Sequence, residues 1–334
     1  EGRLAWEIAR RSRLRVIGFN NDPEQVNQAR QILDEAGAYG TQVVIHQANL
    51  DQLGCRDYLA NLIISDQTVK TGIAPGTASE MFRILRPDGG MAVLGTPRPD
   101  NNLYASASLS KWLGEFKHST DHANGHWALI NRAPLAGAGT WDHFYANPAH
   151  TAASTETGLT DSMQLLWYGQ PGPRHITDRH NRPMSSLYRQ GIMVTPGIDR
   201  LMAYDAYNGT RYWDMVIPDS TRVSVLRDSA WVALAPERVY LAHQQNCVAL
   251  DLRTGVPQQH FDIPDTQAQT EKRWGYVAYQ DDRLYGSSQR ASASVVGQNR
   301  PRIMAFSYGD KLPIGVSESV FCRDRHTGEL RWRY

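Results

Sequence analysis

The residues best suited to chemistry in the first half of the chain are three histidines four residues apart: His118, His122 and His126. On a continuous helix this spacing would turn three imidazoles toward one divalent metal ion. Asn124-Gly125 interrupts that helix, and no carboxylate or cysteine is placed to complete the site. We therefore expect a polar loop before a strand at Trp127–Ile130, and we assign no metal ligand.

A second polar cluster lies in the second half, and its members are His175, Asp178, Arg179, His180 and Arg182. Binding and catalytic residues are concentrated in loops that a rigid scaffold positions. A solvated loop is the simpler interpretation, and we favour it. If this half of the chain carries a site, the cluster is the leading candidate.

Other catalytic signatures are missing from the sequence. It contains no Gly-x-Ser-x-Gly elbow, no P-loop and no Gly-x-Gly-x-x-Gly motif. Cys55, Cys247 and Cys322 are odd in number and far apart, which argues against a disulfide framework and favours free buried thiols.

The composition limits the classes of function. A length of 334 residues permits two domains, each with its own core. The formal net charge is +1, from 35 basic and 34 acidic residues, and no basic run suggests a nucleic-acid surface. No apolar stretch approaches the roughly 20 residues that span a bilayer.

The elements that must position any site in residues 1–135 alternate between strand and helix. We predict helices at Leu4–Arg11, Pro23–Ala36 and Thr77–Leu85, and strands at Arg15–Phe19, Gln42–His46, Leu62–Ser65 and Met91–Gly95. Asp22 can cap the second helix, and Pro23 suits its first position. This alternation predicts an α/β Rossmann-like domain with a parallel, doubly wound sheet.

Two stretches of this half, Ile17–Val26 and Met81–Gly90, resemble class I S-adenosylmethionine-dependent methyltransferases. The second is similar to the family pattern E-x-x-R-v-L-k-P-G-G. In the family, a Gly-rich turn after the first strand cradles the cofactor, and Glu1-Gly2 resembles the last two residues of that turn. The resemblance therefore implies that the first strand is missing and that the chain is a fragment. Its other end, Arg331–Tyr334, falls within a repeat.

The resemblance also implies three acidic positions, and here they are Asn20, Asn49 and Asn61. An amide accepts only through its oxygen, and charge-assisted hydrogen bonds are about twice as strong as neutral ones. By position, the expected S-adenosylmethionine contacts are Gly2, Asn20, Asn21, Asn49 and Leu50. Methyl transfer in the family depends on proximity and in-line orientation, so the catalytic residues stay unknown. Cofactor binding and a degenerate structural domain both remain open.

The second half contains a repeat: Asp205–Gly209, Asp251–Gly255 and Asp324–Gly328, each with Asp four residues before Gly. Trp213 and Trp332 follow their glycines by four residues, and Gln259 holds the same place in the second copy. Asp and Gly favour a tight corner, and the Trp suits packing against a neighbouring sheet. The glycines are 46 and then 73 residues apart, which predicts a four-stranded blade and then one blade with a long insertion. Arg302–Phe306 is one expected strand of that region.

These copies resemble the repeat of PQQ-like (quinoprotein-type) β-propellers over roughly residues 139–334, with Trp141–Pro148 and Leu165–Trp167 similar to the entry segment. Enzymatic quinoproteins place carboxylates, basic groups and a divalent cation around the quinone, and often use adjacent cysteines. We cannot assemble that set from this sequence, so we do not expect PQQ as a cofactor here.

We thus predict a methyltransferase-like domain at 1–135, a linker at 136–140 and a partial, all-β propeller at 141–334. The first functional hypothesis is a bacterial S-adenosylmethionine-dependent methyltransferase whose propeller binds a small-molecule or protein substrate. The second is a non-catalytic interaction protein, like the propeller lipoproteins of outer-membrane assembly. A PQQ-dependent oxidoreductase ranks last. Both a cytoplasmic and a periplasmic location remain open.

Overall fold

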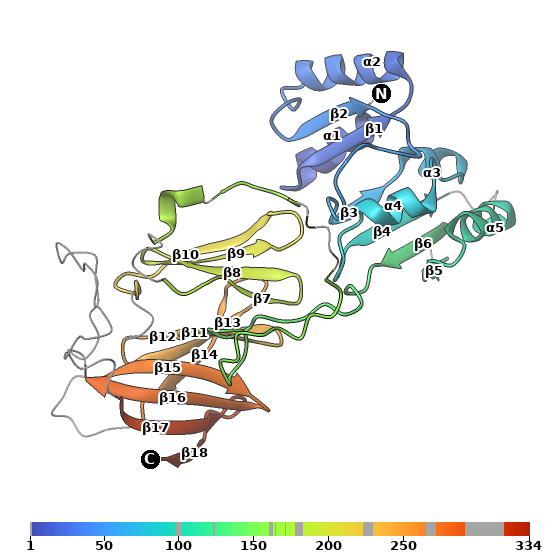
Figure 1. The fold of residues 1–334 in the computed structure, drawn as a ribbon. Helices are drawn as coiled ribbons and strands as arrows, with labels where there is room; N and C mark the ends of the chain where they lie inside the picture. The colour runs from blue at the N-terminus through green and yellow to red at the C-terminus, as the bar shows by residue number, and fades with distance from the viewer. Residues whose placement is uncertain are drawn as a thin grey trace. The chain divides into compact units, whose positions relative to one another are not determined.

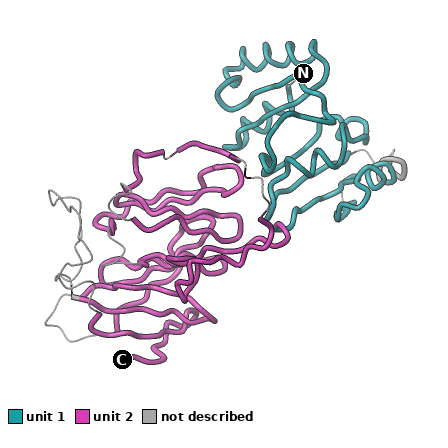
Figure 2. Tube along the Cα trace, viewed as in Figure 1, with its two compact units in different colours: residues 1–134 teal, residues 135–334 magenta. Residues whose placement is uncertain are grey.

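The chain folds as two compact units, residues 1–134 and 135–334 (Figure 2). The computed structural model describes residues 2–97, 102–122, 124–159, 163, 165–170, 172–177, 183–222, 230–264, 272–290 and 317–334. Sheets dominate the described structure and helices are few (Figure 1). None of the helices described there is long and apolar enough to cross a membrane.

The first part of unit 1 packs two helices against a two-stranded parallel sheet. Its elements are α1 Arg3–Arg11, β1 Val16–Asn20, α2 Pro23–Glu35 and β2 Val43–Gln47. The side chain of Asp22 accepts hydrogen bonds from the backbone N–H groups of Glu24 and Gln25, so it caps α2 as predicted. Val26, Leu33 and Val43 are almost fully buried and form the centre of a small apolar core.

A second sheet and its helices complete unit 1. The elements are β3 Leu62–Ile64, α3 Asp66–Thr71, α4 Ala78–Ile84, β4 Met91–Thr96, α5 Asn102–Leu113, β5 Ser119–Asp121 and β6 His126–Asn131, with strand order β3-β4-β6-β5. Leu85, Leu94, Leu113 and Ile130 lie at the centre of a core that is separate from the first one.

The prediction of one parallel, doubly wound sheet is only partly correct. β1 pairs with β2 and β3 pairs with β4 in parallel, but β6 runs antiparallel to both β4 and β5. A short turn joins β5 to β6, and strands joined in that way must be antiparallel. The described strands of unit 1 form two sheets, because none of them pairs with both β1 and β3.

Among the residues that the structure describes, unit 2 contains three sheets, each made of four consecutive antiparallel strands. The first sheet contains β7 Leu187–Arg189, β8 Ile192–Gly197, β9 Arg200–Asp205 and β10 Arg211–Val216. The second sheet contains β11 Val232–Ala235, β12 Arg238–His243, β13 Asn246–Asp251 and β14 Pro257–Asp262. The third sheet contains β15 Lys272–Gln280, β16 Arg283–Arg290, β17 Ser317–Asp324 and β18 Leu330–Arg333. This up-and-down sheet is the unit from which β-propellers are built.

The fourth strand is the most exposed strand of each sheet. Every residue of β11 is fully buried, whereas most of β14 is exposed. β11 contacts both β7 and β15, so the first strands of the three sheets lie next to one another in the core. The predicted long insertion lies between β16 and β17, within one sheet. The expected strand at 302–306 lies outside the described residues.

The three predicted corners, Asp205–Gly209, Asp251–Gly255 and Asp324–Gly328, share one geometry and join the third strand of each sheet to the fourth. In each, the Asp carbonyl accepts a hydrogen bond from the Gly N–H at 2.8–2.9 Å. The Asp Oδ1 accepts from two further backbone N–H groups inside the corner. The glycines have φ of 74°, 71° and 78°, a region that favours glycine over every other residue.

Tryptophan side chains contact two of the three corners, at Gly209 and Gly255. The Trp213 Nε1 donates to the Leu252 carbonyl at 3.0 Å, and its ring lies over Gly255. Trp167 makes the equivalent contacts with the Ala206 carbonyl and Gly209. The prediction that the repeated Trp packs against a neighbouring sheet is confirmed for Trp213.

Candidate functional site

The two central residues of the predicted cofactor site follow neighbouring strands of one sheet. Asn20 ends β1 and Asn49 lies just past β2, and the Ala48 N–H donates to the Asn20 carbonyl at 2.9 Å. Because the carboxyl ends of paired parallel strands meet at one sheet edge, the structure places Asn20 and Asn49 at the same edge. A ligand at the carboxyl end of this sheet would meet them first.

The side-chain oxygens of both asparagines are already used by their own turns. The Asn20 Oδ1 accepts from the Asp22 N–H at 2.8 Å, and its Nδ2 donates to the Gln25 Oε1 at 3.2 Å. The Asn49 Oδ1 accepts from the Asp51 N–H at 3.0 Å. Each amide therefore acts as a turn-forming residue, which is a common role for Asn.

The other predicted contacts also have local roles. Gly2 begins α1 with φ of 74°, and a Cβ there would lie 3.2 Å from the Leu33 side chain of α2. Leu50 packs its carbonyl so closely against Gly76 that no side chain fits at that glycine. Asn21 is exposed in the bend between β1 and α2.

A charged cluster that we did not single out from the sequence braces the segment after β2. The Arg83 Nε donates to the Glu80 Oε2 at 2.8 Å, and the Arg83 Nη1 donates to the Asp57 Oδ1 at 2.6 Å. The Leu53 N–H donates to the Glu80 Oε1 at 2.7 Å. The hydrogen bond from Arg83 to Glu80, followed by that from the Leu53 N–H, lowers the pKa of the Glu80 carboxyl. Glu80 and Arg83, the Glu and Arg of the E-x-x-R pattern, thus connect α4 to the segment after β2. The pattern therefore has a structural role in this fold.

Replacing Glu80 with glutamine should destabilise unit 1 by about 2 kcal/mol at pH 7, the usual size of a charge-assisted hydrogen bond. The pKa of Glu80 is lowered from its ordinary value of 4.5, so its stabilisation is complete above that pH and is lost as the pH falls below it. Urea unfolding of wild type and Glu80→Gln at pH 7 and pH 3 measures both effects. The exposed Glu35 at the end of α2 supplies the control, Glu35→Gln. A gap between wild type and Glu80→Gln that is equal at the two pH values would contradict this role.

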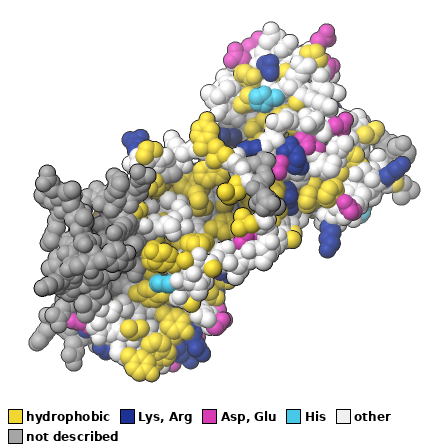
Figure 3. Space-filling view, viewed as in Figure 1, with side chains coloured by type: hydrophobic (Ala, Val, Ile, Leu, Met, Phe, Trp, Pro, Cys, Tyr) yellow, Lys and Arg dark blue, Asp and Glu magenta, His cyan; other side chains and the backbone are white. Residues whose placement is uncertain are grey.

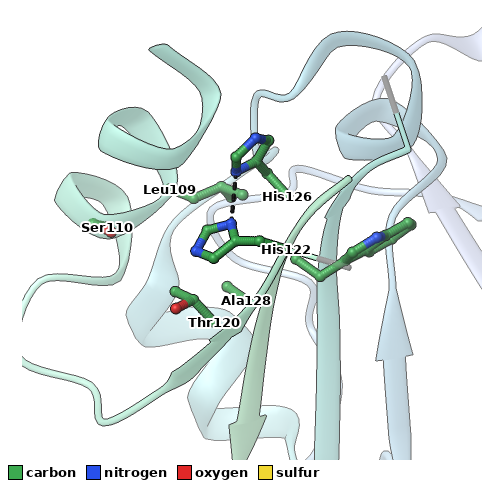
Figure 4. Close-up of a pocket in the computed structure, with 7 residues that line it drawn as sticks. Leu109, Ser110, Thr120, His122, His126 and Ala128 are labelled. Carbon is green, nitrogen blue, oxygen red and sulfur yellow. Dashed lines mark hydrogen bonds between the residues drawn. The ribbon is translucent and has the colours of Figure 1, made fainter. Parts of the chain in front are cut away.

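The histidines near α5 do not share a helix. His118 and His122 flank the strand β5, and His126 begins β6. The expected strand after a polar stretch is confirmed, with β5 as an addition that the sequence analysis missed. The His118 Nδ1 is bonded to the Phe116 carbonyl at 3.0 Å, whereas the His122 and His126 rings meet across the β5–β6 turn (Figure 4).

Only one member of the second polar cluster can be placed. His175 ends a short 3₁₀ helix, Gly172–His175, and its carbonyl accepts from the Ile198 N–H at 2.9 Å. Asp178, Arg179, His180 and Arg182 lie outside the described residues.

Three consecutive residues of the entry segment join the three sheets of unit 2. Trp141 exchanges two backbone hydrogen bonds with Tyr188 of β7, and the Asp142 carbonyl accepts from the Leu234 N–H of β11 at 2.8 Å. The His143 Nε2 accepts from the Tyr279 N–H of β15 at 3.0 Å. The segment therefore fixes the first strands of all three sheets.

The same segment carries a buried charged group. The His143 Nδ1 is bonded to the Asp142 Oδ1 at 2.6 Å, and Arg189 is paired with the Asp142 Oδ2. His143 is only 2% exposed. An Asp–His pair can serve as a general base only when the far ring nitrogen is open. Here the Tyr279 N–H occupies it, so the pair is a structural lock.

A quinone site with its metal ion would need suitable ligands among the described residues. Within them, no group of three His, Cys, Asp or Glu side chains is placed to hold a metal ion. Cys247 and Cys322 are buried free thiols, and Cys55 is half-buried. Burial raises the pKa of the Cys247 thiol, which keeps it protonated and unreactive.

No protein-family model matches the sequence, and no curated protein matches it. Solved structures do match. A quinohemoprotein alcohol dehydrogenase from Pseudomonas putida HK5 is 18% identical over 45% of this chain and 20% of its own, with a TM-score of 0.31. BamB from Moraxella catarrhalis is 17% identical over 46% of this chain and 52% of its own, with a TM-score of 0.26.

A third similar structure is of another kind. It is a Methanococcus maripaludis protein, provisionally described as an S-adenosyl-L-methionine-dependent methyltransferase. It is 17% identical over 40% of this chain and 73% of its own, with a TM-score of 0.31. The chain spans one fifth of the alcohol dehydrogenase and about half of BamB. At these identities the similarity concerns the fold alone.

Proposed function

We propose that this chain is an interaction protein, in which unit 1 is a degenerate methyltransferase-like domain and unit 2 is part of a PQQ-like β-propeller that binds a partner. The observation that supports this most is the use of the Asn20 and Asn49 side-chain oxygens by their own turns. A carboxylate has two oxygens and can hold a turn with one while it binds a ribose hydroxyl with the other. An amide has one oxygen and no charge.

Unit 2 offers apolar surface to a partner. Met163 and Tyr168 are each 89% exposed, on either side of the anchored Trp167. Leu159 and Leu165 are exposed as well. Figure 3 shows apolar side chains gathered at several places on the visible face of this unit. Exposed apolar groups that cluster commonly mark protein interaction sites.

We expect no saturable heat when S-adenosylmethionine is titrated into the full chain at high micromolar concentration. The Asn20 and Asn49 amides lack the charge and the second oxygen that a ribose and an adenine would need. Isothermal titration calorimetry of wild type and Asn20→Ala, with an active methyltransferase as the positive control, makes the measurement. Saturable binding by wild type that is lost in Asn20→Ala would overturn the proposal.

One observation favours a second function, a methyltransferase. Asn20 and Asn49 lie at the same edge of a parallel sheet, which is where such a cofactor would bind. Saturable S-adenosylmethionine binding by wild type that is lost in Asn20→Ala would support this candidate. Methyl transfer would then depend on proximity and orientation.

A further inference from the structure

We propose that His122 and His126 form a two-imidazole binding site for a divalent transition metal such as Zn²⁺ or Cu²⁺. The Nδ1 atoms of the two rings are 2.9 Å apart, and the ring planes are inclined by 62° (Figure 4). The site is independent of the proposed function. Neutral imidazole is the commonest metal ligand that proteins supply.

The strand register explains why the two rings meet. Thr120 pairs with Ala128 and Asp121 pairs with Trp127, which places His122 opposite His126 at the end of the β5–β6 hairpin. Side chains two residues apart on a strand point to the same face. Thr120 of β5 and His122, directly after β5, therefore share their face with His126 and Ala128 of β6.

The distance between the nitrogens suits a chelate. With metal–nitrogen bonds of about 2.0–2.1 Å, two cis ligands are about 2.9 Å apart at a right angle and about 3.3 Å apart in a tetrahedron. The 2.9 Å separation matches the first value and needs only a small ring rotation for the second. The proton that one Nδ1 now donates moves to Nε2 of the same ring, so each Nδ1 presents a lone pair and the charge of the pair is unchanged.

The surroundings restrain the turn and leave a hollow beside the two rings. The Trp127 Nε1 donates to the Asn124 carbonyl across the turn at 3.2 Å. Gly125 has φ of 123° and packs against the Thr96 carbonyl, where no side chain fits. Leu109 and Ser110 of α5 border the hollow beside the rings. Water can complete the metal's coordination, and the Ser110 and Thr120 side chains line the same hollow.

The test titrates Zn²⁺ into the full chain, without a histidine tag, by calorimetry. We expect the affinity to fall at least about tenfold in His122→Asn and in His126→Asn, because the second imidazole acts at a high effective concentration. His118→Asn is the matched control, since His118 lies in the same stretch and bonds to the Phe116 carbonyl. It should leave the affinity unchanged.

Spectroscopy provides a readout that does not depend on affinity. With one equivalent of Cu²⁺, electron paramagnetic resonance should show two equivalent imidazole nitrogens in wild type and one in either variant. Asparagine retains hydrogen bonding at both positions, and circular dichroism in EDTA checks that the variants fold. Equal Zn²⁺ affinity in wild type and the double variant His122→Asn/His126→Asn would overturn the proposal, as would a single nitrogen in wild type.

Discussion

Replacing Asp142 with alanine should lower the free energy of unfolding of unit 2 by about 3–5 kcal/mol, the usual cost of removing one partner of a buried ion pair. Asp142 is 7% exposed and binds both His143 and Arg189. Its loss leaves the His143 Nδ1 and the Arg189 guanidinium without their shared acceptor. The hydrogen bond from Tyr279 to His143 should weaken as well, because Asp142 orients the ring.

Urea unfolding followed by hydrogen-exchange mass spectrometry measures the effect, because exchange in β11 and β15 reports on unit 2 by itself. Glu329→Ala is the control, since Glu329 is 69% exposed and lies 4.0 Å from its partner, Arg331. In the double variant Asp142→Ala/Arg189→Met, part of the loss should be recovered, because no unpaired cation remains. A loss below about 1 kcal/mol, the usual upper value for a surface ion pair, would show that Asp142 does not lock the sheets.

Replacing Gly255 with alanine should cost about 2–5 kcal/mol, considerably more than the same change at Gly328. Both glycines have positive φ, which costs an alanine about 1–2 kcal/mol at either position. A Cβ at Gly255 would also lie 2.8 Å from the Trp213 ring, whereas at Gly328 its nearest neighbour is Gln259 at 3.5 Å. The overpacking adds about 1–3 kcal/mol at Gly255 alone.

Gly328→Ala is therefore the matched control for backbone strain, and urea unfolding compares the two. The background Trp213→Ala removes the clash, so within it Gly255→Ala should cost no more than Gly328→Ala. Equal costs for the two glycine variants in the wild-type background would show that the Trp213 ring does not constrain the corner.

The local features of the fold could be predicted from the sequence. Asp22 and Pro23 predict the start of a helix, and each Asp–Gly pair predicts a corner. Both predictions succeed because the interacting groups are at most four residues apart. The antiparallel direction of β6 was not predicted. The alternation of strands and helices was interpreted as parallel strands joined by crossovers, but β5 and β6 form a hairpin. The packing of Trp213 was predicted correctly because the repeat itself implies a neighbouring sheet.

The candidate sites were harder to predict than the elements. Sequence placed Asn20 and Asn49 at strand ends, but only the structure shows that their oxygens are used by the following turns. The histidines were predicted to lie in a polar loop before a strand, whereas His122 and His126 meet across a hairpin turn. The buried Asp142–His143 pair contacts Arg189 and Tyr279, which are far away in the chain. A single sequence carries no signal of such contacts.

The entry segment has a consequence for the order in which unit 2 matures during synthesis. His143 reaches its Tyr279 partner across 136 residues. At about 5–20 residues per second a ribosome needs roughly 7–27 s to add that length of chain. The contacts of Trp141 with β7 and of Asp142 with β11 can form before then, but His143 cannot bind β15 until the third sheet has been synthesised.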